Sequence, residues 1–356
     1  MNLFSPFTVG RMSLPNRIAM APMTRSRWAY PDLVPRYYAA RADAGLLITE
    51  STSVSPLSVS RPHSSRMDDD LWVPRWRSVT DAVHAQGGRI FQQLYHLGRK
   101  SDPTRLPAAQ LPVAPSAIAA TGKIEGVDGP VDFAVPRALE TDEIAGIVAQ
   151  FADAARRADA AGFDGIELHG ANCYLIDQFL RDGTNKRTDR YGGGVANRAR
   201  FALEIVDAVS AVLGAERVGL RVSPHAGGDG ICDSDPVALY GYLAQPLNAR
   251  KIAYLHLVEA IGYGVPKRSP PPGTALLMPV VRKAFAGPLI VAGGYTRASG
   301  DQVIAEGRAD LVAFGELYIA NPDLVERLRR NAPFNETDRA TVYGGGAEGY
   351  IDYPTL

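Results

Sequence analysis

Three polar residues directly behind one apolar segment are the strongest indication of chemistry in this sequence. Residues 165–168 have the apolar character of a buried strand, and His169, Asn172 and Tyr174 follow it closely. His169 and Asn172 both donate hydrogen bonds, and two donors aimed at one oxygen suit a substrate carbonyl that becomes more negative as it reacts. The phenol of Tyr174 adds a proton source. We therefore expect the active site at the end of this segment.

The elements that would position these side chains alternate regularly along the chain. Short apolar runs typical of buried parallel strands occur at 17–21, 46–50, 89–94, 165–168, 217–222, 253–258, 288–292 and 310–314. Segments with helical periodicity lie between them, for example at 71–86, 141–161 and 197–213. Eight alternations predict an α/β fold, a single (β/α)8 TIM barrel over 1–356, in which polar residues at the strand ends converge.

The sequence also predicts how three other segments are built. The helix at 141–161 opens with the capping pattern Thr141-Asp-Glu143. Residues 3–15 contain a turn at Val9-Gly10 and predict a short N-terminal hairpin that caps the other end of the barrel. Residues 96–139, after the third strand, are too long for an ordinary connection and rich in Pro, Ala and Gly. We expect this long excursion to form a lid or hairpin over the barrel mouth.

Composition and charge exclude several classes of protein. The 38 basic residues balance the 38 acidic ones, which argues against a nucleic-acid partner. The two cysteines, Cys173 and Cys232, are too few for a disulfide framework and, like the histidines, lack metal-site spacing, so we expect free thiols, no metal and a cytoplasmic location. The amino terminus has no basic stretch followed by an apolar block, so we expect no secretory leader, and no run approaches the ~18 apolar residues of a membrane span. We expect no membrane association, and either a monomer or a homodimer.

Residues at other strand ends indicate a flavin. Pro22, Met23 and Thr24 follow the first strand, where backbone groups and a hydroxyl can meet a ring edge. Gln93 on the third strand can both donate and accept, as a pyrimidine-like edge requires. Arg221 on the fifth strand would place a positive charge beside N1 and O2 of the flavin and stabilise the reduced anion.

The last two strands predict a phosphate site. Gly293-Gly294 and Gly315-Glu316 follow the seventh and eighth strands, where such barrels commonly bind phosphate because glycine lets backbone N–H groups approach the anion. No Gly-x-Gly-x-x-Gly turn follows a strand, as a dinucleotide-binding Rossmann unit would require. The pattern fits a bound mononucleotide, with any nicotinamide cofactor visiting as a substrate.

These motifs resemble the old yellow enzyme family of FMN-dependent ene-reductases over nearly the whole chain. The matching stretches are 21–24, 37–50, 93–99, 169–180, 187–193, 221–224, 320–323 and 344–350. The resemblance implies an oxidoreductase of the NADPH dehydrogenase type with tightly but non-covalently bound FMN. Its transient hydride donor would be NAD(P)H, and its partners would be small-molecule alkenes activated by a carbonyl or nitro group.

The resemblance also implies a role for each matching residue. Thr24 would contact the flavin O4, Gln93 the pyrimidine edge, and Arg221 N1 and O2. The remaining cofactor contacts would come from Ala21, Pro22, Met23, Ser51, Gly293, Gly294, Gly315 and Glu316, the last four at the phosphate. His169 and Asn172 would bind the substrate oxygen, while Tyr174 protonates Cα after hydride reaches Cβ from the flavin N5. The substrate pocket would also include Tyr95, Arg61 and Tyr343.

Three residues depart from the family pattern. Glu316 stands where the family usually has an arginine facing the phosphate, so weaker FMN binding is expected. Arg61 falls near the position where many relatives have an aromatic residue at the substrate pocket, which bears on substrate preference. Cys173 replaces the usual glycine before Tyr174, and a positive φ there would be expected to displace the tyrosine.

Two other functions stay open at this point. One is a degenerate flavin barrel that survives as a binding or scaffold protein without turnover. The other is a dienoyl thioester reductase, although the clustered cysteines of its iron–sulfur site are missing from this sequence.

Overall fold

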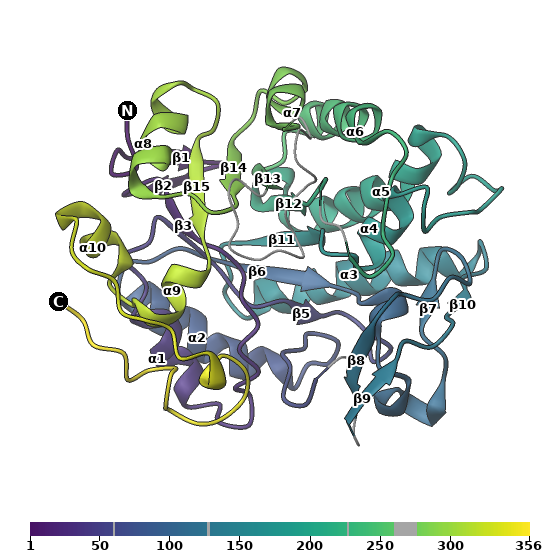
Figure 1. The fold of residues 1–356 in the computed structure, drawn as a ribbon, viewed down its shortest axis with the longest axis horizontal. Helices are drawn as coiled ribbons and strands as arrows, with labels where there is room; N and C mark the ends of the chain where they lie inside the picture. The colour runs from purple at the N-terminus through teal and green to yellow at the C-terminus, as the bar shows by residue number, and fades with distance from the viewer. Residues whose placement is uncertain (60, 127–128, 226–227, 260–275) are drawn as a thin grey trace.

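The computed structural model describes residues 1–59, 61–126, 129–225, 228–259 and 276–356, and parallel strands close into a barrel at its centre (Figure 1). In chain order the barrel strands are β3 (Ile18–Met20), β4 (Leu46–Ile48), β6 (Ile90–Tyr95), β11 (Gly165–Gly170), β12 (Val218–Val222), β13 (Tyr254–Val258), β14 (Leu289–Ala292) and β15 (Leu311–Phe314). Each pairs with the next, and β15 pairs with β3. The predicted (β/α)8 barrel is confirmed.

The barrel interior changes from apolar to polar along its axis. Near the amino ends of the strands it is filled by buried apolar side chains, namely Ala19, Leu46, Ile48, Phe91, Tyr254, Ile290 and Leu311. Two residues further along β6, β11 and β13, the inward positions are Gln93, Glu167 and His256, all fully buried. Residues two apart on a strand face the same side, so these polar side chains form the next layer inside the barrel. This polar layer lies between the apolar layer just described, here called the apolar plug, and the carboxyl ends of the strands.

The predicted N-terminal hairpin is present and closes the apolar end. Strands β1 (Phe7–Val9) and β2 (Met12–Leu14) pair antiparallel, and Val9 and Leu14 pack against the apolar plug. Gly10, in the turn, has φ +56°, and an added Cβ would lie 2.3 Å from the carbonyl oxygen of Glu216. Only glycine fits this turn.

Helices cover the outside of the barrel. They are α1 (Leu33–Ala39), α2 (Trp72–Ala85), α3 (Glu143–Ala160), α4 (Leu175–Leu180), α5 (Val195–Leu213), α6 (Pro236–Arg250), α7 (Met278–Ala284), α8 (Arg297–Ala305), α9 (Glu316–Ala320) and α10 (Leu324–Arg330). The three predicted helices correspond to α2, α3 and α5. None of the helices within the described ranges is long and apolar enough to cross a membrane.

The capping pattern predicted for α3 is wrong. The residue before the helix is Asp142, whose side chain makes no capping bond. Glu143 instead accepts the N–H of Glu140 at 2.7 Å, and the hydroxyl of Thr141 is bonded to Asp189. The threonine is drawn toward a distant acceptor rather than toward its own helix.

The long excursion after β6 contains a hairpin, as expected. Strands β8 (Lys123–Gly126) and β9 (Gly129–Asp132) pair antiparallel, next to the short parallel pair β7 (Val113–Ala114) and β10 (Arg137–Ala138) (Figure 1). The Arg99 guanidinium donates to the carbonyls of Ile118, Ala119 and Asp229. These bonds attach the excursion to the loop that follows β12.

Candidate active site

A cavity of about 920 Å³ opens at the carboxyl ends of the barrel strands. Its lining includes seven of the residues predicted to contact the cofactor, which are Ala21, Pro22, Arg221, Gly293, Gly294, Gly315 and Glu316. They come from strand ends up to 295 positions apart in the chain, since the barrel brings β3, β12, β14 and β15 around one opening.

Two of the three glycines of this cavity have backbone conformations that favour glycine. Gly293 and Gly294 have φ of +135° and +76°, which L side chains rarely adopt. A Cβ added to Gly315 would project toward Ala21 and Met23, 3.7 Å from the Ala21 Cβ and 3.8 Å from the Met23 Sδ. These are ordinary van der Waals distances, so the space beside Gly315 is open, and Gly315 itself lines the cavity.

The Glu316 side chain extends toward solvent. It is 66% exposed, and its carboxylate lies 3.4 Å from Arg339 Nη2. Arg297 is one of three arginines that line the cavity, with Arg221 and Arg327. It lies at the start of α8, where its Nη1 donates to Asn331 Oδ1 at 2.6 Å. We did not predict Arg297, although its position three residues after Gly294 is a usable signal.

Gln93 belongs to a buried network rather than to the cavity lining. Its Oε1 accepts from the Ser51 hydroxyl at 2.5 Å and its Nε2 donates to Glu167 Oε1 at 2.7 Å. The other oxygen of Glu167 lies 2.8 Å from His256 Nδ1. Burial lowers the pKa of His256, against the opposing charge of Glu167. Ser51 and Glu167 together fix the orientation of the Gln93 amide, that is, the positions of its oxygen and its nitrogen. The sequence did not indicate this role of Glu167.

The loop after β3 is ordered by a buried carboxylate. Glu50 accepts from the backbone N–H groups of Arg25 at 3.0 Å and Ser26 at 3.2 Å, and from Trp28 Nε1 at 3.0 Å. Burial raises the pKa of Glu50, while these donors act in the opposite direction. Met23 and Thr24 are half-buried immediately before this anchor. The loop that is predicted to face the flavin is thus anchored by its hydrogen bonds to Glu50.

The three predicted catalytic residues lie together. The side-chain nitrogens Asn172 Nδ2 and His169 Nε2 are 3.5 Å apart, and the Tyr174 ring centre lies 4.9 Å from that of His169. The ring of Tyr95, a predicted substrate contact, lies 5.3 Å from that of Tyr174. Two nitrogen donors and one phenol therefore converge at the end of β11.

Two consecutive residues of the connecting loop are left-handed. Asn172 has φ +57° and Cys173 has φ +66°, so the condition considered for Cys173, a positive φ, is met. The Asn172 N–H donates to Ser223 Oγ at 2.9 Å, and the Cys173 N–H donates to Asp177 Oδ2 at 3.0 Å. Tyr174 nevertheless packs against His169, because these bonds stabilise the loop; the expected displacement is wrong.

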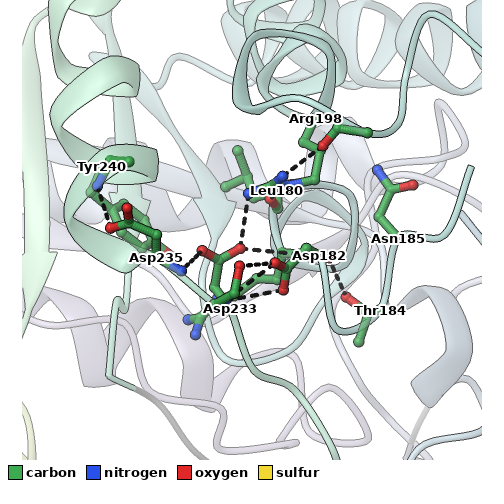
Figure 2. Close-up of polar contacts among 12 residues, drawn as sticks. Leu180, Asp182, Thr184, Asn185, Arg198, Asp233, Asp235 and Tyr240 are labelled. Carbon is green, nitrogen blue, oxygen red and sulfur yellow. Dashed lines mark hydrogen bonds and ion pairs between the residues drawn. The ribbon is translucent and has the colours of Figure 1, made fainter.

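A network behind this loop connects it to the end of β12. Asp177 binds Arg181 at 2.8 Å, and Arg181 donates to the carbonyls of Ser223 and Pro224. Figure 2 shows the continuation, in which Arg198 donates to the Leu180 carbonyl and pairs with Asp233 at 3.1 Å. The loops after β11 and β12 are therefore fixed relative to each other, which no local pattern in the sequence predicted.

Lys100 is a further charged residue at the site. Its ammonium lies 5.2 Å from the centre of the Tyr174 ring and forms an ion pair with Asp229 at 2.5 Å. Burial acts to lower the pKa of Lys100, but Tyr174 and Asp229 more than compensate and raise it. The side chain therefore remains a cation at neutral pH beside the phenol. The sequence analysis did not single it out.

The other two predicted substrate residues lie apart from the large cavity. The Arg61 guanidinium stacks 4.4 Å from the ring centre of Tyr343, which is 54% exposed. Arg61 lines a separate cavity of about 200 Å³. Their contact with substrate stays a prediction.

Comparisons with known proteins agree with this architecture. Residues 2–335 match the NADH:flavin oxidoreductase / NADH oxidase family. The chain is 43% identical to 12-oxophytodienoate reductase 1 of Oryza sativa subsp. japonica, covering 99% of this chain and 93% of that protein. It is 42% identical to 12-oxophytodienoate reductase 2 of Arabidopsis thaliana, covering 99% and 96%.

Solved structures give the same result for the fold. Morphinone reductase matches with a TM-score of 0.94 and 46% identity, over 100% of this chain and 96% of that chain. The old yellow enzyme homologue from Zymomonas mobilis matches with a TM-score of 0.95 and 38% identity, over 100% of both chains. The likeness therefore includes every strand end that forms the cavity.

Proposed function

The chain belongs to the NADH:flavin oxidoreductase / NADH oxidase family, the family of the old yellow enzymes, and from this we propose how its residues perform the reaction. It is an FMN-dependent ene-reductase that reduces the activated C=C bond of small-molecule alkenes with a nicotinamide cofactor. Morphinone reductase has been solved in complex with tetrahydroNAD, which supports a nicotinamide cofactor as the donor here.

The residues of the 920 Å³ cavity fit FMN. Gly293, Gly294 and Gly315 leave backbone groups accessible, as a phosphate requires, and Arg221 supplies a positive charge for the pyrimidine side of the ring. Gln93, oriented by Ser51 and Glu167, and the Pro22–Thr24 loop, anchored by Glu50, would hold the ring edges. When bound, FMN supplies two-electron redox chemistry between the nicotinamide cofactor and the alkene.

The observation that carries the proposal is the convergence of His169 and Asn172. The Ala171 N–H points to His169 Nδ1 at 3.3 Å, so Nδ1 must be an acceptor and a neutral ring carries its proton on Nε2. Nε2 and the Asn172 amide are then two donors 3.5 Å apart, suited to one substrate oxygen. They stabilise the negative charge that grows on this oxygen during reduction.

Tyr174 is the proposed proton donor to Cα. Its ring packs against His169 and Tyr95, so the phenol stays next to the proposed oxygen site. The degenerate-barrel alternative would gain from a displaced Tyr174 or a carboxylate buried at the phosphate site. Neither feature is present among the described residues, because Tyr174 remains against His169 and Glu316 extends outward.

The proposal includes four finer expectations. One FMN-binding domain spans 1–356, supported by the pairing of β15 near one chain end with β3 near the other. The location is cytoplasmic, the donor is NADPH or NADH, and the protein is a monomer or a homodimer.

The test is a visible absorption spectrum of the purified protein, followed by NADPH under anaerobic conditions and then cyclohexenone. We expect a flavin spectrum that bleaches with NADPH and returns with the alkene. A protein that remains colourless with excess FMN would instead favour the binding or scaffold function.

A further inference from the structure

A second cavity, the 200 Å³ cavity lined by Arg61, has the composition of an anion site. Its remaining polar lining consists of two more arginines, a histidine and four serines, namely Arg66, Arg105, His63, Ser53, Ser58, Ser64 and Ser65. None of the described residues that line it is acidic. Guanidinium and hydroxyl groups together are preferred partners of phosphate and carboxylate oxygens.

Two of the arginines, Arg66 and Arg105, are held in place by buried carboxylates outside the cavity. Arg66 binds Asp68 with both Nε, at 3.0 Å, and Nη2, at 2.5 Å. Arg105 Nε lies 2.9 Å from Asp102 Oδ2. The two carboxylates are 4% and 0% exposed and do not line the cavity. They fix the guanidinium groups before any ligand arrives, which lowers the entropy lost on binding.

Arg61 leaves one positive charge unbalanced. Its guanidinium stacks on Tyr343 at 4.4 Å, and among the described residues it meets no carboxylate. Stacking orients the plane of the group without using its N–H donors. These donors remain available to a ligand in the cavity.

The cavity is next to the active site. Ser53, in β5 (Thr52–Ser53), pairs with Tyr95 of β6, and paired strands lie about 4.8 Å apart. The Ser58 hydroxyl accepts the Leu97 N–H at 2.9 Å, which attaches the cavity loop to the end of the same strand. Since Tyr95 packs 5.3 Å from Tyr174, the cavity lies about one strand beyond the ring that contacts the proton donor.

We propose that this cavity binds an oxyanion, a phosphate or a carboxylate, carried by one of the two molecules that use the neighbouring active site. The source is either the phosphate of NADPH or a carboxylate on the alkene, so this assignment rests on the proposed function. A volume of about 200 Å³ is sufficient for the anionic group itself.

The test compares Arg61→Gln with wild type and with Arg75→Gln. Arg75 is an exposed arginine stacked on Trp72, so its substitution removes the same charge and the same kind of contact elsewhere. Two ratios of kcat/KM are measured, NADPH over NADH, and a carboxylate-bearing enone over its methyl ester. Ratios cancel any general loss of activity. We expect at least one ratio to fall about tenfold or more in Arg61→Gln and neither to change in Arg75→Gln.

The outcomes separate the sources. A fall in the NADPH ratio identifies the cofactor phosphate, and a fall in the acid ratio identifies the alkene carboxylate. Both ratios within about twofold of wild type overturn the proposal.

Calorimetric titration with inorganic phosphate adds a readout that needs no turnover. Weaker phosphate binding in Arg61→Gln than in Arg75→Gln would support the cavity as an anion site even in a protein with no ene-reductase activity. Phosphate binding equal in the two variants would count against it.

Discussion

The Lys100 ammonium lies 5.2 Å from the centre of the Tyr174 ring, within an ion pair with Asp229. When Tyr174 gives up a proton, negative charge remains on its oxygen. A lone cation about 5 Å from such a charge at a partly buried site stabilises it by on the order of 3 kcal/mol. The Asp229 carboxylate, which is paired with Lys100, opposes part of this effect. Lys100 is only 18% exposed, so much of this effect survives.

We predict that Lys100→Met slows alkene reduction about tenfold, a change of about 1.4 kcal/mol. Methionine preserves the length of the side chain and removes its charge. Reduction of the bound flavin by NADPH needs no proton from Tyr174 and should be unaffected, so stopped-flow measurement of the two half-reactions checks the prediction. Lys100→Arg, which retains the charge, is the control. An equal slowing of both half-reactions would contradict this explanation.

His169→Ala with Asn172→Ala removes both donors proposed for the substrate oxygen. Loss of one such donor lowers turnover by about 10²–10³ in other enzymes, and we expect at least this loss for cyclohexenone reduction. FMN binding should persist, since neither residue lines the cavity that contains the cofactor glycines. The flavin spectrum therefore serves as the control for folding. Unchanged cyclohexenone turnover would refute the assignment.

The two cysteines should differ strongly in reactivity. Cys173 is buried, and this burial, with the charge of Asp177 as a smaller cause, raises the pKa of its thiol to about 12. A raised thiol pKa keeps the unreactive protonated form throughout the range below it, whereas Cys232 is exposed. A disulfide reagent at pH 7 to about pH 9 should label one thiol per native chain and two after unfolding. Cys232→Ser should abolish the native labelling, and two rapidly labelled thiols in the native protein would disprove the burial argument.

Glu316→Arg should tighten FMN binding about tenfold by replacing a carboxylate with a cation beside the phosphate glycines. Glu316→Gln should improve it by only a few-fold, because the carboxylate is 66% exposed and already faces Arg339. Titration of apoprotein with FMN, followed by flavin fluorescence, gives the dissociation constants. Glu306→Gln, an exposed carboxylate outside the cavity, is the control. Identical affinities in all variants would place the phosphate away from Glu316.

The φ of +66° at Cys173 gives a stability prediction. A non-glycine residue in this region costs the folded state about 1–2 kcal/mol of strain. Glycine relieves this strain, but it also lowers the free energy of the unfolded chain by about 0.4–1 kcal/mol through added conformational entropy. Cys173→Gly should therefore be more stable to urea than Cys173→Ala, by up to about 1 kcal/mol. Both variants lose the same buried sulfur, so the comparison removes the contribution of the sulfur and leaves the backbone and the buried Cβ of alanine as the differences. A more stable alanine variant would show that the loop relaxes to negative φ.

The positions of the barrel strands and the proximity of the three proposed catalytic residues were readable from the sequence, because both depend on neighbours along the chain. An apolar run marks a strand that is buried on both faces, and parallel strands of a barrel carry their chemistry at one end. His169, Asn172 and Tyr174 lie within six positions of one strand, so their proximity follows once β11 is identified.

The capping pattern at Thr141 failed for the opposite reason. Its hydroxyl can bond either to its own helix or to Asp189, 48 positions away in the chain. Which of the two partners lies within reach depends on tertiary packing.

The supporting contacts were decided by the tertiary structure. Glu167 meets Gln93 and His256 across 74 and 89 positions, and Lys100 meets Asp229 across 129. No local periodicity encodes such pairs, because they exist only after barrel closure sets the register of β6, β11 and β13.

The same holds for the departures from the family pattern. The residue types of Glu316 and Arg61 were evident from the sequence, and so was the resemblance that indicated the class of reaction. The outward direction of the Glu316 carboxylate and the separate cavity around Arg61 follow from contacts with Arg339 and Tyr343 at the far end of the chain. Side-chain direction depends on what packs around a residue, and that is a property of the folded chain alone.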